Sequence, residues 1–201
     1  MEHYKTSGFS RSAWVGMTRL LAVFCLIFSW SAQATAPRIT SQMFGEEKKA
    51  DIVGYQLAPL DAAAKSEGEL AVEIVTEAFK AAGKMPLVDV LPSKQLATYA
   101  LFSNDAVALI GIQQDLAAKE KNQYRVVTFY LRGIAPGEEP VSLIFSKKNA
   151  RGNELQQAFN EGLQKIIKSG KYLEILEKYH GKGKVPADYV SRLKHHNPGW
   201  K

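Results

Sequence analysis

The alternation of short apolar runs with amphipathic stretches in the first half of the chain limits the fold most. Apolar runs of strand length occur at Ala50–Leu57, Met85–Leu91 and Ala106–Ile112. Two stretches with helical periodicity separate them, Glu69–Ala82 and Ser93–Phe102. Parallel strands need crossover connections of about a dozen residues or more, which are usually helices. The pattern therefore predicts an α/β fold with a mostly parallel sheet flanked by helices.

The residues inside these segments support the assignment. Ser93 follows a proline and is a candidate N-cap of the second helix. The run Ala106–Ile112 is continuously apolar, as expected of a strand buried on both faces. Met85–Leu91 is also too apolar for an exposed face, so we expect it to be buried. In the first helix the apolar side chains recur with helical spacing: Leu70, Ala71, Ile74, Val75, Ala78 and Phe79.

The second half of the chain continues the sheet and then covers it. Tyr124–Leu131 and Val141–Phe145 have the composition of strands, and the loop Arg132–Pro140 between them is rich in Gly, Pro and Glu. The segment Asn153–Gly181 has the strongest pattern in the chain and predicts two helices joined at one glycine. Such a helical hairpin has to pack on an apolar surface upstream, which the sheet provides.

The two helices of this hairpin have recognisable ends. Asn153 is the predicted N-cap of the first helix, and Gly170 its predicted left-handed C-terminal end. The second helix is expected from about Lys171 to Gly181, followed by a polar tail, Lys182–Lys201, with one turn near residues 187–193. The apolar face of the first helix consists of Leu155, Ala158, Phe159, Leu163, Ile166 and Ile167.

The first 34 residues have the pattern of a secretory signal. Three basic residues precede the apolar run Leu20–Trp30, and small residues follow it. We expect cleavage after Ala34, because a cut after Ala36 would leave Pro37 directly behind it. Met17 is an alternative start. An uncleaved membrane anchor is the other interpretation, but this run has eleven residues against the roughly 20 that span a bilayer.

Cleavage would leave 167 of the 201 residues, enough for one domain. We expect a signal peptide at 1–34, one α/β domain at 35–184 and the polar tail at 185–201. The only cysteine, Cys25, would leave with the signal, so no disulfide or thiolate metal site is expected. The net charge falls from +6 to +4, because residues 1–34 carry three basic and one acidic side chain. The remaining lysines form only short clusters, at Glu46–Lys49, Lys119–Lys121 and Lys182–Lys184, which argues against nucleic acid as a partner.

Several short motifs carry a resemblance to a known family. They are Gly54-Tyr55 with Pro59-Leu60, then Ser103-Asn104-Asp105-Ala106, and finally Phe159-Asn160, Leu163, Gly170, Ile175 and Lys178-Tyr179. In this order they resemble the bacterial extracellular solute-binding proteins of family 3, the periplasmic partners of amino-acid ABC importers. The resemblance implies a periplasmic binding protein type II-like fold and a periplasmic location. It also implies a small polar solute such as an amino acid, and an inner-membrane permease or other envelope protein as partner.

The chain departs from this family in two places. Family members have two lobes, and the second is inserted between strands like Val126–Tyr130 and Val141–Phe145. Here the interval Leu131–Pro140 is too short for a lobe, so essentially one lobe is expected. The family's ligand arginine should follow Ala106–Ile112, where this chain has Gln113-Gln114-Asp115. An amide does not replace a bidentate guanidinium contact to an α-carboxylate.

A ligand site is expected at the carboxyl ends of the parallel strands, where open α/β sheets bind ligands. Tyr55 could stack on a ligand or belong to the core. Lys94 could hold an anion beside a helix N-terminus or be plain surface. Arg132 ends a strand facing the presumed cleft, and an ion pair with Glu138 or Glu139 would keep it from binding a ligand. The full set is Tyr55, Pro59, Leu60, Ser93, Lys94, Gln113, Gln114 and Arg132.

The sequence offers little for catalysis. No serine lies in a G-x-S-x-G motif, and no glycine-rich phosphate loop is present. His195 and His196 are adjacent and make a poor metal site, so neither metal nor cofactor is expected. The leading hypothesis is an exported solute-binding-like protein. The alternatives are a single-lobe interaction or regulatory module of the cell envelope, and a small dehydratase-like enzyme using Asp89, Asp105 and Asp115.

Overall fold

The computed structural model describes residues 50–57, 67–116, 121–132 and 139–200. Five strands form one sheet: β1 (Ile52–Tyr55), β2 (Val88–Leu91), β3 (Ala108–Ile112), β4 (Tyr124–Arg132) and β5 (Glu139–Ser146). The α-helices are α3 (Glu67–Ala81), α4 (Lys94–Phe102), α5 (Gly152–Lys168), α6 (Lys171–His180) and α7 (Tyr189–His195). Two 3-10 turns, η2 (Gln113–Asp115) and η3 (Lys121–Gln123), precede β4.

The sheet has the strand order β2-β1-β3-β5-β4. β1 pairs in parallel with both β2 and β3, whereas β5 pairs antiparallel with β3 and with β4. Four strands therefore run in one direction and β5 alone runs against them. This confirms the predicted α/β fold with a mostly parallel sheet.

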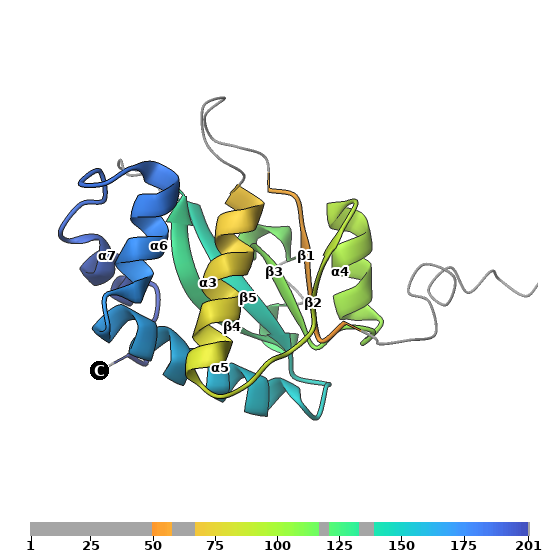
Figure 1. The fold of residues 1–201 in the computed structure, drawn as a ribbon. Coiled ribbons are helices and arrows are strands. Elements are labelled where there is room, and N and C mark those ends of the chain that lie inside the picture. Colours follow the sequence, from red (N-terminus) through yellow and green to blue (C-terminus); the bar gives the residue numbers. More distant parts are fainter. Residues whose placement is uncertain (1–49, 58–66, 117–120, 133–138, 201) are drawn as a thin grey trace, which may run out of the picture. The chain divides into compact units, whose positions relative to one another are not determined.

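The helices lie on both faces of the sheet. The connections β1-α3-β2 and β2-α4-β3 run in opposite directions along the sheet, so right-handed crossovers place α3 and α4 on opposite faces. Figure 1 shows this arrangement, with α5 beside α3 and with α6 following α5. The hairpin of α5 and α6 thus packs on the α3 face, as its apolar pattern predicts.

A very close helix crossing fixes α3 against α5. A Cβ atom added to Gly162 of α5 would lie 1.7 Å from the carbonyl oxygen of Ala78 on α3. Only glycine allows two helix backbones to approach this closely. Phe159, one turn earlier, packs its ring against Phe79 and Phe129 with centroid distances of 5.3 and 5.7 Å. The glycine therefore sets the position of α3 over the sheet.

The helix ends follow the sequence signals in part. The side chain of Ser93 accepts a hydrogen bond from the Leu96 N–H at 3.3 Å, which confirms it as the N-cap of α4. Gly170 has a φ of 82°, which confirms the left-handed end of α5. The prediction of Asn153 as an N-cap is wrong, because α5 begins at Gly152 with Arg151 in the cap position. Asn149 makes the turn there by accepting from the Arg151 N–H.

The expectation that Met85–Leu91 is buried is also wrong. β2 is an edge strand, and three apolar side chains of this segment are strongly exposed: Met85 by 90%, Leu87 by 42% and Val90 by 48%. The reason is its place in the sheet. It pairs only with β1 among the described strands, so its outer edge has no neighbouring strand there.

The segment expected to be a polar tail folds against the opposite edge of the sheet. Tyr189 and Leu193 of α7 are buried, and so is Asn197. The Tyr189 hydroxyl accepts from the Leu131 N–H at 2.8 Å and donates to the Leu131 carbonyl at 3.0 Å. An edge strand exposes such unpaired groups, and here side chains from the C-terminal segment bind them on β4.

None of the helices in the described residues is long and apolar enough to cross a bilayer.

Candidate functional site

The predicted site lies at the carboxyl edge of the sheet, where β1, β2, β3 and β4 end and β5 begins. Three connections leave from this edge: residues 58–66, 117–120 and 133–138. They lie outside the described residues, and Pro59 and Leu60 lie with them. β4 and β5 pair up to Arg132 and Glu139, so only residues 133–138 separate the two strands. The described part of the chain therefore forms one lobe, as the short Leu131–Pro140 interval predicts.

Tyr55 belongs to the core. Its side chain is 8% exposed. A Cβ atom on Gly111, its neighbour on β3, would lie 3.4 Å from Cε1 of the tyrosine ring. The ring therefore packs across the backbone of β3, on the face of the sheet opposite Gly54 and Val90.

Ser93 and Lys94 begin α4 and lie near the carboxyl end of β2. The half-buried Ser93 uses its hydroxyl to cap the helix. Lys94 is exposed as the first residue of the helix. Both are on the α4 side of the sheet, because α4 itself packs there against β1, β2 and β3.

Gln113 and Gln114 form the turn η2 directly after β3. Gln113 is half-buried and Gln114 is exposed. Their amides are placed at the carboxyl edge, as the sequence predicts, and can offer uncharged hydrogen bonds there.

Arg132 is buried in an ion-pair network at the same edge. Its Nε donates to the Glu67 carboxylate at 2.7 Å, and its Nη1 donates to Glu139 at 2.6 Å. Arg132 and Glu67 are 8% and 4% exposed, respectively. Burial on its own lowers the pKa of Arg132, but the two carboxylates outweigh it and raise the pKa. The guanidinium thus binds the protein's own carboxylates. The pairing with Glu139 was one of the two that the sequence suggested, whereas the pairing with Glu67 was not predicted.

The sequence-predicted residues therefore do not form one pocket. Tyr55, Ser93 and Lys94 lie on the α4 side of the sheet, whereas Arg132 binds Glu67 at the start of α3. Gln113 follows the central strand β3.

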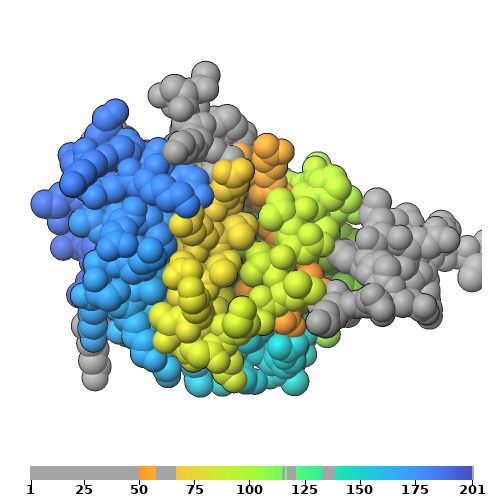
Figure 2. Space-filling model, viewed as in Figure 1, coloured from red at the N-terminus to blue at the C-terminus, as the bar shows by residue number. Residues whose placement is uncertain are grey.

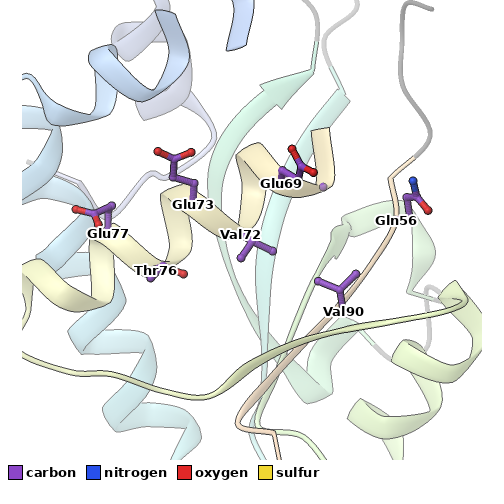
Figure 3. A pocket seen from close by; sticks show the side chains of 8 residues that line it. Gln56, Glu69, Val72, Glu73, Thr76, Glu77 and Val90 are labelled. Carbon is purple, nitrogen blue, oxygen red and sulfur yellow. The ribbon is translucent and has the colours of Figure 1, made fainter. Parts of the chain in front are cut away.

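A groove lies instead on the other face, between α3 and the edge strand β2. Its volume is about 530 Å³. Figure 2 shows this face, with the gold surface of α3 between the blue C-terminal helices and the green surface of β2 and α4. In Figure 3, Val72 of α3 and Val90 of β2 point into the gap, while Gln56 and Glu69 stand at its carboxyl-edge end. The lining consists of Gln56, Gly68, Glu69, Val72, Glu73, Thr76, Glu77 and Val90.

The groove is lined with carboxylates, of which Glu73 pairs with Lys178 and Glu77 with Lys80 at 3.3 Å. Its lining includes three glutamates and neither lysine nor arginine. Glu73 bridges α3 to α6, because Lys178 Nζ donates to it at 2.7 Å and the Tyr179 hydroxyl at 2.8 Å. Burial alone raises the pKa of Glu73, but these two hydrogen bonds outweigh it and lower the pKa. Burial, together with the bond to this carboxylate, raises the pKa of Tyr179 to about 12.

The sequence contains a signal for this groove in the spacing of three glutamates, which an analysis of the apolar residues alone does not include. Glu69, Glu73 and Glu77 recur every four residues on the polar side of α3, so they form one ridge. Their spacing predicts an acidic helix face. It does not indicate that this face borders an edge strand, because the order of strands in a sheet depends on contacts between residues far apart in the sequence.

The three aspartates that the sequence offers as candidate acids do not come together in the described residues, and metal ligands do not cluster there. No group of three or more His, Cys, Asp or Glu residues is placed to hold a metal ion in the described part of the chain. Asp89 is exposed on β2, whereas Asp105 precedes β3 and accepts a hydrogen bond from Ser103 at 2.5 Å. The side chain of Asp115, the third candidate acid, lies outside the described residues.

Comparisons with known proteins give a match in structure and none in sequence. No protein-family model matches the chain, and no curated protein matches it significantly. The fold is similar to the arginine-, lysine-, histidine-binding protein ArtJ of the thermophilic bacterium Geobacillus stearothermophilus. The TM-score is 0.50 and the identity 17%, over 73% of this chain and 100% of that chain.

Two weaker similarities were also found. YckB of Bacillus subtilis aligns with a TM-score of 0.46 and 14% identity, over 68% of this chain and 92% of that one. Arginine-bound domain 1 of TmArgBP aligns with a TM-score of 0.38 and 11% identity, over 57% of this chain and 90% of that one. Together with the sheet order and the two-sided helix layers, the match to ArtJ identifies the fold. The described part of the chain has the α/β fold of a single periplasmic-binding-protein lobe.

Proposed function

We propose that this chain is an exported solute-binding-like protein that binds a small polar solute, an amino acid or a similar molecule. The observation that carries the proposal is the groove beside α3, which has Gln56 and Glu69 at its carboxyl-edge end. Open α/β sheets bind ligands outside the carboxyl ends of their strands. The groove volume of about 530 Å³ falls within the range of roughly 300–1,000 Å³ found for small-molecule sites.

The lining favours a solute with a positive charge. Glu69 offers a carboxylate and Gln56 an amide at the same end of the groove. Hydrogen bonds from ammonium or guanidinium groups to a carboxylate are among the strongest in proteins. Val72 and Val90 supply an apolar surface for an aliphatic stem. ArtJ, whose fold is similar, is named for binding arginine, lysine and histidine, and basic amino acids are the class that suits this groove.

Binding by one lobe is expected to be weak. The groove is not an enclosed cavity, so part of a bound solute stays in water. Arg132 is held by Glu67 and Glu139, so it does not supply the α-carboxylate contact. We therefore expect dissociation constants near millimolar, which correspond to about −4 kcal/mol.

The export part of the proposal rests on residues 1–34 and their signal-like pattern. Expression of the full chain in a Gram-negative host, followed by osmotic release and N-terminal sequencing, tests it. We expect a periplasmic product that begins at Thr35. A product that stays with the membrane and keeps its first 34 residues would instead show an anchor. An inner-membrane permease is the partner that such a protein would serve.

Isothermal titration calorimetry tests solute binding. We expect heat with arginine, lysine or histidine and none with aspartate or citrate. Replacement of Glu69 by Gln should weaken binding at least 10-fold, because a charge-assisted bond is lost. Glu161→Gln on the exposed side of α5 is the matched control and should leave binding unchanged. Absence of heat with every solute, for a protein with native circular dichroism, would remove the proposal.

One observation favours a second candidate function, an interaction module of the cell envelope without small-molecule transport. The edge of the sheet at β2 exposes apolar side chains at Met85, Leu87 and Val90. Exposed apolar surface of this kind often marks a protein contact. A protein that binds no solute but docks a partner at β2 would support this candidate over the first.

A further inference from the structure

The outer edge of β2 presents backbone groups that the described sheet does not use. Leu87 directs its N–H to the Asp51 carboxylate at 3.1 Å, and its carbonyl accepts from the Ile52 N–H at 3.0 Å. Both groups of Leu87 thus point toward β1. Peptide groups of successive residues alternate in direction along a strand. Val88 and Val90 therefore point their N–H and carbonyl groups away from β1, where no other described strand lies.

The groove beside α3 runs along this open edge. From Gly68 to Glu77 the helix extends about 14 Å, and the four residues of β2 extend about 13 Å. Val72 and Val90 form the apolar floor, and Glu69, Glu73 and Glu77 lie along one rim, where Lys178 binds Glu73 and Lys80 binds Glu77. The helix and the strand are therefore similar in length. A short extended segment paired with β2 would run beside the groove, whose surface is partly apolar and carries carboxylates.

The residues around the edge disfavour a second copy of this chain as the occupant. Pairing of Val88 with Val90 of another β2 in an antiparallel dimer would place Asp89 directly opposite its own equivalent. Like charges opposite each other destabilise a strand pair. Pro86 and Pro92 flank β2 and limit pairing to a few residues, as edge strands that avoid open-ended association do. The exposed Asp89 instead favours a partner strand that carries positive charge.

We propose that the open edge of β2 docks a short, extended, basic segment of a partner protein by strand addition. The segment's backbone pairs with the outward groups of Val88 and Val90. Its side chains alternate between the two faces of the sheet, one toward Asp89 and the other toward the groove. Basic residues then meet Asp89 on one face or the glutamate rim on the other. Main-chain bonds supply affinity, and the charges supply specificity.

A fluorescein-labelled peptide, acetyl-Lys-Val-Lys-Val-Lys-Val-Lys-amide, is the probe. We expect its fluorescence anisotropy to rise on titration with the purified protein, and the affinity to fall as salt is added. The same peptide with each Val replaced by Pro keeps its charge but loses the N–H group of every second residue, and these groups are donors for strand pairing. We expect it to bind at least 10-fold more weakly. A Glu-Val peptide of equal length should not bind.

Variants of the protein locate the contact. Val88→Pro removes one outward donor at the first residue of an edge strand, where proline is tolerated, and should weaken binding at least 10-fold. Val88→Thr keeps the donor and should bind within twofold of the native protein. The double variant D89K/E77K should lose the Lys-Val peptide and gain the Glu-Val peptide. Glu161→Lys makes a like charge change on α5 and should alter neither.

Two results would overturn the proposal. Equal binding of the Lys-Val and Lys-Pro peptides would show attraction by charge without strand pairing. A native dimer that Val88→Pro converts to a monomer in light scattering would show that a second copy occupies the edge. The proposal shares Val90 and Glu77 with the groove that would hold a solute, but Val88 and Asp89 do not line that groove, so their variants test strand pairing apart from solute binding. Calorimetry with amino acids can therefore fail while the peptide binds, and the reverse.

Discussion

Asn197 binds both backbone polar groups of Thr128 on the edge strand β4. Its Oδ1 accepts from the Thr128 N–H at 3.0 Å, and its Nδ2 donates to the Thr128 carbonyl at 2.8 Å. The amide thus takes the place of a neighbouring strand. Asn197 is 7% exposed, so these bonds are shielded from water.

Replacement of Asn197 by Ala should therefore leave two buried backbone groups without partners. We expect a loss of about 1–3 kcal/mol in the free energy of unfolding, measured by urea denaturation. His196→Ala, at the exposed neighbouring position, is the control and should change stability little. Equal stability of both variants would show that Asn197 adds nothing to the edge.

The buried pair of Arg132 and Glu67 gives a second prediction. Arg132→Met should destabilise the protein by about 3–5 kcal/mol, because it leaves a buried carboxylate uncompensated. The double variant R132M/E67M removes both charges and should recover most of that loss. Glu139→Gln should cost less, since Glu139 is 38% exposed. A small loss in R132M, combined with loss of solute binding, would instead assign Arg132 to a ligand.

The bridge from Glu73 to α6 predicts a pH dependence. The pKa of Glu73 is lowered in the folded protein, since the Lys178 and Tyr179 hydrogen bonds outweigh burial. Its contribution to stability is therefore complete above the unfolded glutamate pKa of about 4.3. It disappears as the pH falls through the lower folded value. Urea denaturation should show Glu73→Gln to be less stable than the native protein near neutral pH. The difference in the free energy of unfolding should shrink as the pH falls below about 4.3. A constant difference at all pH values would argue against this bridge.

The contact between Gly162 and Ala78 gives a prediction about packing. Gly162→Ala would place a methyl group against the Ala78 carbonyl, so α5 has to move away from α3. We expect at least about 2 kcal/mol of destabilisation, near the middle of the range for overpacking. Gly199→Ala, where an added Cβ meets no atom within 4 Å, is the matched control. Thermal unfolding of both variants measures the difference.

Local signals predicted much of the fold. Ser93 caps α4 and Gly170 ends α5, because each feature depends only on neighbouring residues. Asn153 was the wrong N-cap because a tertiary contact intervenes: a Cβ on Gly152 would lie 2.3 Å from the Ser146 carbonyl, so the chain enters the helix there. The capping residue alone did not contain that information.

The site was harder to predict for the same reason. Arg132 and Glu67 are 65 residues apart in sequence, and the sequence directed attention to the glutamates beside Arg132. The groove needs two facts at once: the glutamate ridge of α3 and the placement of β2 at the edge of the sheet. The first is visible in the periodicity of Glu69, Glu73 and Glu77, whereas the second follows only from the strand order.

The pairing of Asn197 with Thr128 also has a consequence for synthesis. The two residues are 69 positions apart, so the ribosome makes β4 long before the side chain that protects its edge. Until then β4 can pair only with β5, and its outer edge is open to other chains. A translocation machinery that keeps the chain extended until its end has emerged would prevent such pairing. For the export proposed above, the late protection of β4 favours folding after transport over folding during translation.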